Sequence, residues 1–212
     1  MQDLRKTQNR NKKNPIGGHF DYGRQGTSTT HILEKMLTKM EESYHVFLTP
    51  TGFGSVFLSI FSIVRPGDEI LVADPVYNPT RLLTEDFLKD FKIKVTFYDP
   101  HELETLKRKI TKKTKMIFVE NPGSNTFEFQ DLSKIISIAK KNKIISAIDN
   151  TWATPYFLKP MKLGFDMSIV SATKYYSGHS DVMGGSLAVN KKVFKHVQQA
   201  TKITGLRLSP DD

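Results

Sequence analysis

The chain alternates short apolar segments with amphipathic ones over most of its length, and this alternation limits its fold more than any other feature. Short apolar segments that are bounded by turn residues are typical of buried strands. Such strands are expected at residues 69–73, 93–98, 115–120, 144–149, 167–171 and 186–189. Helices are expected from Ser28, after Gly54, and at residues 80–90, 101–110, 131–142 and 191–204. Strands that are apolar throughout and separated by helices form a largely parallel sheet with helices on both faces, so the sequence predicts an α/β fold.

The first predicted helix begins at Ser28, where Thr and Ser residues supply caps. Its apolar residues recur on one face of the helix. They are Ile32, Leu33, Met36, Leu37 and Met40. Residues 1–26 are polar and without period, so we expect an extended arm there. With 212 residues, of which 38% are hydrophobic, the chain is expected to form one large domain over residues 27–205.

The composition excludes several kinds of site. There is no cysteine, which removes disulfides, thiolate metal sites and cysteine nucleophiles. The six histidines show no ligand spacing, so no metal site is expected. The longest apolar run, residues 56–64, is too short to span a bilayer, and the N-terminal residues lack the apolar stretch of a secretory signal. We expect a soluble, cytoplasmic protein with no membrane partner.

A formal net charge of +9 raises nucleic acid as a partner, because clustered lysines release counterions from phosphates. The lysine runs at residues 107–115, 140–143 and 191–195 lie instead at the ends of predicted helices or in adjoining loops. Lysine is favoured at those places by the helix dipole and by solvation. A solvated surface is therefore the favoured interpretation, and no nucleic-acid partner is expected.

Functional side chains collect where predicted strands end and helices begin. In parallel sheets, ligands bind at the carboxyl ends of the strands. Five segments carry polar or aromatic groups there. They are Thr51-Gly52-Phe53-Gly54, Asp74-Pro75-Val76-Tyr77, Glu120-Asn121-Pro122-Gly123, Asp149-Asn150-Thr151-Trp152 and Ser171-Ala172-Thr173-Lys174. Each segment alone has an ordinary explanation, because an aspartate after a strand is commonly a turn or cap residue and a lysine is commonly exposed.

The combination of these segments points to one cofactor, pyridoxal phosphate. A helix N-terminus and small hydroxyls suit its phosphate, and an aromatic ring suits stacking on its pyridine ring. A carboxylate keeps the ring nitrogen protonated, and a lysine forms an imine with the aldehyde. No other common ligand requires all of these groups together.

The run from Ser171 to Gly185, SATKYYSGHSDVMGG, resembles the signature of the cysteine and methionine metabolism group of pyridoxal-phosphate enzymes. That resemblance implies an aspartate aminotransferase-like fold, the PLP fold type I large domain. Within the group, three further motifs are similar to those of bacterial cystathionine β-lyases. They are YGRQGTST from Tyr22, ENPGS from Glu120 and IDNTWA from Ile148. The resemblance extends from about Tyr22 to Pro210.

The resemblance implies a role for each matching position. Lys174 would bind the cofactor covalently and move the α-proton, Asp149 would face the pyridine nitrogen, and Tyr77 would stack on the ring. The remaining positions would hold the phosphate. They are the Gly52 and Phe53 amides, the Ser171 and Thr173 hydroxyls, and Tyr22 and Arg24, which would reach the cofactor of a neighbouring subunit. A homo-oligomer, a dimer of dimers, is implied as well.

The reaction that the resemblance implies is β-elimination of L-cystathionine to homocysteine, pyruvate and ammonia. Members of the group continue past the equivalent of Leu206 into a C-terminal domain, whose arginine binds the substrate carboxylate. We therefore expect residues 206–212 to begin the link to such a domain, and the chain alone to have little activity. A cystathionine γ-synthase or γ-lyase type enzyme and a cofactor-binding fragment without catalysis remain as alternatives.

Overall fold

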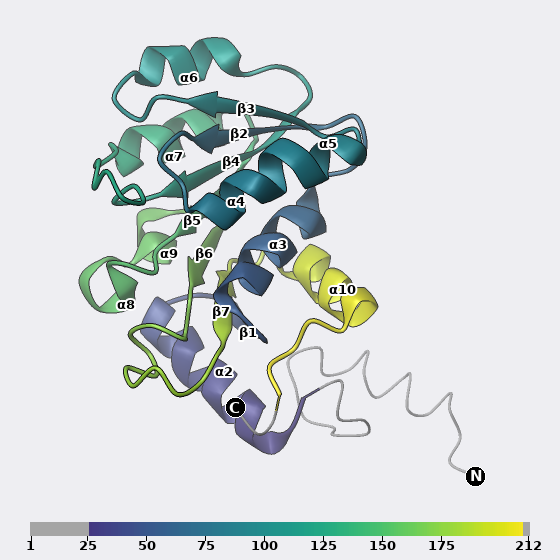
Figure 1. Ribbon diagram of the computed structural model, residues 1–212, viewed down its shortest axis with the longest axis vertical. Helices are drawn as coiled ribbons and strands as arrows, with labels where there is room; N and C mark the ends of the chain where they lie inside the picture. Colours follow the sequence, from purple (N-terminus) through teal and green to yellow (C-terminus); the bar gives the residue numbers. More distant parts are fainter. Residues whose placement is uncertain (1–25, 210–212) are drawn as a thin grey trace.

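The computed structural model describes residues 26–209, in which a sheet of seven strands forms the centre (Figure 1). The strands are β1 (His45–Thr49), β2 (Glu69–Ala73), β3 (Lys94–Tyr98), β4 (Thr114–Glu120), β5 (Ile145–Asp149), β6 (Met167–Val170) and β7 (Gly185–Val189). Their spatial order is β1-β7-β6-β5-β4-β2-β3. The five strands from β2 to β6 run parallel, whereas β7 is antiparallel to both β6 and β1. The predicted largely parallel sheet is confirmed.

Helices cover both faces of this sheet, as predicted. They are α2 (Ser28–Glu41), α3 (Gly52–Ile63), α4 (Asn78–Leu82), α5 (Leu88–Asp90), α6 (Leu103–Lys109), α7 (Leu132–Lys141), α8 (Thr154–Phe157), α9 (Pro160–Leu163) and α10 (Phe194–Thr204). A π-helical turn, Leu83–Phe87, joins α4 to α5, so the helix predicted at residues 80–90 is nearly continuous. Figure 1 shows α3, α4 and α10 in front of the sheet and α7 behind it.

The central strands are buried on both faces, which explains their apolar sequences. Successive side chains of a strand point to opposite faces. In β2 the consecutive residues Ile70, Leu71 and Val72 are all 0% exposed, so helices pack on both sides of this strand. In β4 the same holds for Met116 and Phe118 on one face and Ile117 on the other.

Three elements were not predicted from the sequence. β1 lies at residues 45–49, where polar His45 and Thr49 interrupt the apolar pattern at both ends. Both side chains are buried here, because β1 pairs with β7 under a cover of helices. The helices α8 and α9 have four residues each, too few to show a helical period.

The helix α2 forms where it was predicted, but its apolar stripe, apart from Leu37, faces outward. Ile32 and Met36 are 58% and 62% exposed. The buried residues of this helix are Thr30, Glu34, Leu37 and Glu41. In the described chain, the amphipathic pattern of α2 therefore places acidic groups against the body of the protein.

No helix within residues 26–209 is long and apolar enough to cross a membrane. Over the same range, no group of three or more His, Asp or Glu side chains is arranged to hold a metal ion.

Candidate active site

The parallel strands bring the predicted segments to one edge of the sheet. β2, β4, β5 and β6 are neighbours, so the residues that follow them emerge side by side. Glu120 at the end of β4 is the register partner of Asp149 at the end of β5. The segment after β6 is joined to the one after β5, because the Ser171 amide donates to Thr151 Oγ1 at 2.9 Å. Four of the five predicted segments thus meet at this edge.

Asp149 is a half-buried carboxyl without a cation beside it. Its Oδ1 accepts a hydrogen bond from the Thr151 amide at 3.0 Å. Burial raises the pKa of Asp149, and the hydrogen bonds from Thr151 only partly offset this. Among residues 26–209, no lysine, arginine or histidine forms an ion pair with it. The site therefore favours a positively charged or proton-sharing group from a ligand.

Glu120 places a second carboxyl group at this edge, beside that of Asp149. Its pKa is raised to about 8, first because burial disfavours the carboxylate and then because of the negative charge of Asp149. Its Oε2 accepts a hydrogen bond from the Tyr77 amide at 2.6 Å. No role was predicted for Glu120 from its own segment, although the residue ends a strand adjacent to that of Asp149. If the predicted strands are placed in their order in the sheet, the last residue of β4 lies beside the last residue of β5, and this would have identified Glu120 as a site residue.

The loop after β2 is fixed against the loop after β4. A Cβ atom at Gly123 would lie 2.7 Å from the Pro75 ring, so only glycine permits this approach. The Ser124 amide donates to the Pro75 carbonyl oxygen at 2.8 Å. Together with the bond to Glu120, these contacts hold the backbone of Tyr77, whose side chain is 48% exposed. An exposed ring on a fixed backbone suits stacking on a planar ligand.

The N-terminus of α3 offers free amides close to Ser171. Thr51 Oγ1 caps the helix by accepting from the Gly54 amide at 2.8 Å. The first amides of a helix lack intrahelical acceptors, which leaves those of Gly52 and Phe53 for an anion. A Cβ atom at Gly52 would lie 2.5 Å from the Ser171 Oγ atom. The helix end and the Ser171 hydroxyl therefore adjoin, as a phosphate site requires.

The hydroxyl group of Thr173, the second predicted phosphate ligand after β6, is already hydrogen-bonded within the protein. The Thr173 hydroxyl accepts from the Gly184 amide at 3.0 Å and donates to the Gly184 carbonyl oxygen at 3.2 Å. Thr173 thus already links its own segment to the start of β7. Its predicted role as a phosphate ligand stays a prediction, and it requires this bond to be shared or exchanged.

Lys174 lies in a turn at the same edge and is exposed. The turn is closed by bonds from the Lys174 amide to the Ser171 carbonyl at 3.1 Å and from the Gly178 amide to the Lys174 carbonyl at 2.8 Å. Tyr22 and Arg24, the other predicted phosphate ligands, lie outside the described residues.

The comparisons with known proteins agree on one family. The family model described as Cys/Met metabolism PLP-dependent enzyme matches residues 3–212. The chain is 34% identical to the cystathionine beta-lyase of Haemophilus influenzae and 33% identical to an L-alanine/L-glutamate racemase of Wolbachia pipientis. These matches cover 92% and 93% of this chain but only 50% and 48% of the relatives. The chain therefore spans about half the length of the curated relatives that it matches.

A solved structure agrees with the fold as well. The crystal structure of cystathionine gamma-lyase from Lactobacillus plantarum, complexed with L-serine, matches with a TM-score of 0.85 and 30% identity. The match covers 92% of this chain and 51% of the solved one. The aspartate aminotransferase-like fold of the large domain, expected from the sequence, is confirmed.

The first prediction concerns the stability of the acidic edge. The pKa of Glu120 is about 8 in the folded state, against an ordinary value of 4.5. Between these two pH values the folded state keeps a proton that the unfolded state has released, so the free energy of unfolding falls as the pH rises from 4.5 through 8. Glu120→Gln keeps the acceptor for the Tyr77 amide and removes this proton. We expect the variant to gain about 1–2 kcal/mol over the parent at alkaline pH, and little at acid pH.

Urea unfolding of both chains across that pH range measures the effect. Glu102→Gln, at an exposed carboxyl without a side-chain cap bond, is the control and should follow the parent. Parallel stability curves for Glu120→Gln and the parent would contradict the assigned burial of this carboxyl.

Proposed function

The chain belongs to the family of Cys/Met metabolism PLP-dependent enzymes, and we propose that it carries the cofactor-binding part of a carbon–sulfur lyase. The specific reaction that we propose is β-elimination of L-cystathionine to homocysteine, pyruvate and ammonia. Cystathionine lyases among the relatives and solved structures support this choice. An amino acid is then the small-molecule substrate.

One observation of the structure carries the proposal: the candidate site has opposite charge preferences at its two sides. The N-terminus of α3 with Ser171 suits an anion, whereas the half-buried pair of Glu120 and Asp149 forms no ion pair with a cation within residues 26–209. Pyridoxal phosphate has a phosphate on one side of its ring and a basic nitrogen on the other. The described residues therefore fit this cofactor.

Each residue at the edge has a separate task in the proposed mechanism. The α3 amides and the Ser171 hydroxyl would bind the phosphate and so fix the position of the ring. Asp149 would hold a proton on the ring nitrogen, since its raised pKa favours sharing that proton. Bound in this way, the cofactor supplies the electron sink that stabilises a carbanion at the substrate Cα.

Lys174 and Tyr77 complete the proposed mechanism. The exposed ring of Tyr77 would cover one face of the cofactor and exclude water from it. Lys174 Nζ would hold the cofactor covalently, and the same amine would accept the α-proton of the substrate. We propose that Tyr22 and Arg24 reach the phosphate of a neighbouring copy, which makes the complete site that of a homo-oligomer.

A second candidate reaction follows from the racemase relative. Racemisation and β-elimination both begin with removal of the α-proton, so Lys174 and Asp149 serve either reaction. The two reactions differ in what happens next at the β-carbon. A γ-lyase reaction, suggested by the solved structure, requires a further proton transfer at that carbon.

The covalent role of Lys174 gives the second prediction. We expect the parent chain, incubated with pyridoxal phosphate and reduced with borohydride, to gain one cofactor adduct on the peptide that contains Lys174. Lys174→Ala should abolish this adduct, because no other lysine is predicted at the edge. Peptide mass spectrometry is the measurement, with Lys191→Ala as a control at an exposed lysine. An adduct on another peptide at full yield in Lys174→Ala would refute the assignment.

The third prediction concerns Asp149→Asn. The amide keeps the size of the side chain but no longer stabilises a proton on the ring nitrogen. We expect exchange of the α-proton of a bound amino acid with deuterated water to slow by about 100-fold, while cofactor remains bound. Asp86→Asn, at an exposed carboxyl on the π-helical turn, is the control. Equal exchange rates in Asp149→Asn and the parent would remove Asp149 from the mechanism.

The fourth prediction distinguishes the candidate reactions by their products. From L-cystathionine, β-elimination gives pyruvate and homocysteine, whereas γ-elimination gives 2-oxobutyrate and cysteine. A racemase converts L-alanine to the D form and releases neither oxoacid. We expect pyruvate as the main oxoacid product. D-alanine from a separate incubation with L-alanine, with no oxoacid from L-cystathionine, would favour the racemase reaction.

A further inference from the structure

A buried carboxyl lies behind the turn that carries Lys174. Glu41, the last residue of α2, is 0% exposed. Its Oε1 accepts a hydrogen bond from the Tyr176 hydroxyl at 3.3 Å, while its Oε2 has no partner within hydrogen-bond geometry among the described residues. A buried carboxyl that is only half satisfied is costly, and a purely structural site would favour an apolar side chain.

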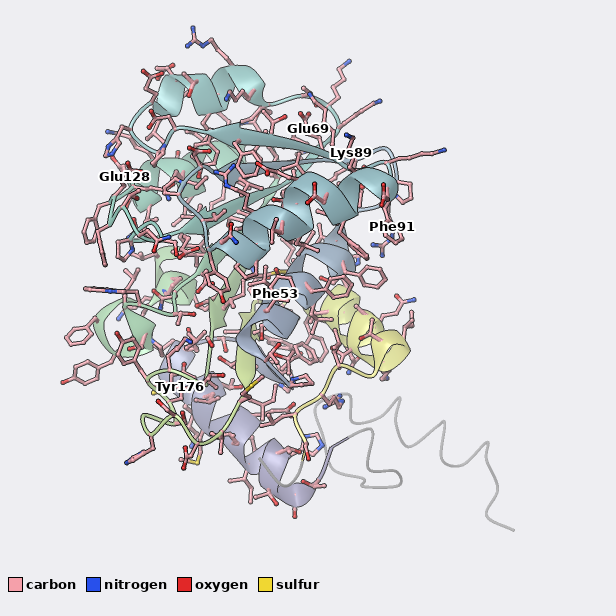
Figure 2. The ribbon with its side chains drawn as sticks, viewed as in Figure 1. Phe53, Glu69, Lys89, Phe91, Glu128 and Tyr176 are labelled. Carbon is pink, nitrogen blue, oxygen red and sulfur yellow. The ribbon has the colours of Figure 1, made fainter. Side chains whose placement is uncertain are left out.

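Tyr176 connects this carboxyl to the turn. It follows Lys174 by two residues, inside the turn closed by the Gly178-to-Lys174 bond and by a bond from the Ser177 amide to the Ala172 carbonyl at 3.0 Å. Its ring packs on a small apolar cluster of Leu37, Val46, Leu48 and Ala188. Figure 2 labels Tyr176 beside α2, on the side of the loop that follows β6. The side chain thus holds the turn against α2 and the antiparallel strands.

The surroundings of Glu41 place the pKa of its carboxyl group near neutral pH. Burial raises its pKa to about 7, and the Tyr176 hydroxyl, the Ser168 hydroxyl and the positive charge of Lys159 lower it only in part. Lys159 is itself paired with the exposed Glu42, which Lys162 also approaches at 3.9 Å. Burial and the charge of Glu41 both raise the pKa of Tyr176, which therefore remains a hydrogen-bond donor.

We propose that Glu41 is a positioning residue for Lys174: its carboxyl holds Tyr176, and through Tyr176 it holds the turn of residues 172–178 closed. The neutral carboxyl favours the closed turn. Ionisation favours opening, because opening admits water to a carboxylate that is otherwise buried. The turn is therefore held firmly below neutral pH and opens more often above it. The link to catalysis rests on the proposed function, whereas the state of the turn does not.

Amide hydrogen exchange of residues 172–178 in the chain without cofactor tests the anchor directly. For the parent, protection relative to the unstructured exchange rate should fall by about tenfold between pH 6 and pH 8.5, since opening moves the carboxyl pKa from about 7 toward 4.5. Glu41→Gln imitates the neutral form and should keep full protection at both pH values. Tyr176→Phe should lower protection at both pH values by about tenfold, the cost of one hydrogen bond.

Tyr175→Phe is the matched control, because Tyr175 adjoins Tyr176 but is 62% exposed. It should behave as the parent. A pH dependence in Glu41→Gln equal to that of the parent, or unchanged protection in Tyr176→Phe, would overturn the proposal. A change only in global unfolding, without a change confined to the turn, would overturn it too.

A second arm adds pyridoxal phosphate and follows the borohydride adduct at Lys174. Glu41→Gln should retain at pH 8.5 the adduct yield that the parent shows at pH 6, and Tyr176→Phe should need about tenfold more cofactor. If no variant, the parent included, forms the adduct, the proposed function fails. The exchange results then still decide whether Glu41 holds the turn.

Discussion

The parallel register of β4 and β5 is the constraint on which the candidate site depends. It sets Glu120 beside Asp149, two carboxyls that burial and mutual repulsion make reluctant to ionise together. The pair also orders its surroundings, since Glu120 holds the Tyr77 amide and the loops around Pro75 and Gly123 close against each other. Because the described part of the chain pairs no cation with this acidic edge, the edge favours a ligand that brings a positive charge or a proton.

The opposite side of the site has the opposite preference, and this polarity explains why one cofactor fits. The α3 amides at Gly52 and Phe53 adjoin Ser171, so an anion is favoured there. A ring that spans the two sides is held in one orientation only. Membership of a PLP-dependent family agrees with this arrangement over residues 3–212, while the chain spans about half the length of its relatives. Lys174 is exposed in the described chain, and the turn that carries it is linked to α2 by the hydrogen bond from Tyr176 to Glu41.

Much of the fold follows from local pattern, and the failures have physical causes. The strands at residues 69–73 and 144–149 were predictable because their centres are buried on both faces and therefore mostly apolar. β1 was missed because His45 and Thr49 are polar yet buried by tertiary packing. The outward apolar stripe of α2 and the buried Glu41 reverse the usual pattern, and the period of a helix alone does not tell which face is inward. Glu120 was missed as a site residue because its importance arises from the neighbouring strand and not from its own segment.

The most direct test of the account is the protonation state of the cofactor ring nitrogen when the chain is loaded with nitrogen-15-labelled pyridoxal phosphate. The nitrogen-15 chemical shift reports that state without any turnover. The account predicts that the nitrogen remains protonated at pH values at which the free cofactor has lost this proton, because Asp149 shares it in a partly desolvated site. A nitrogen that titrates as it does in free solution would contradict the central claim that this edge of the sheet binds the pyridine ring.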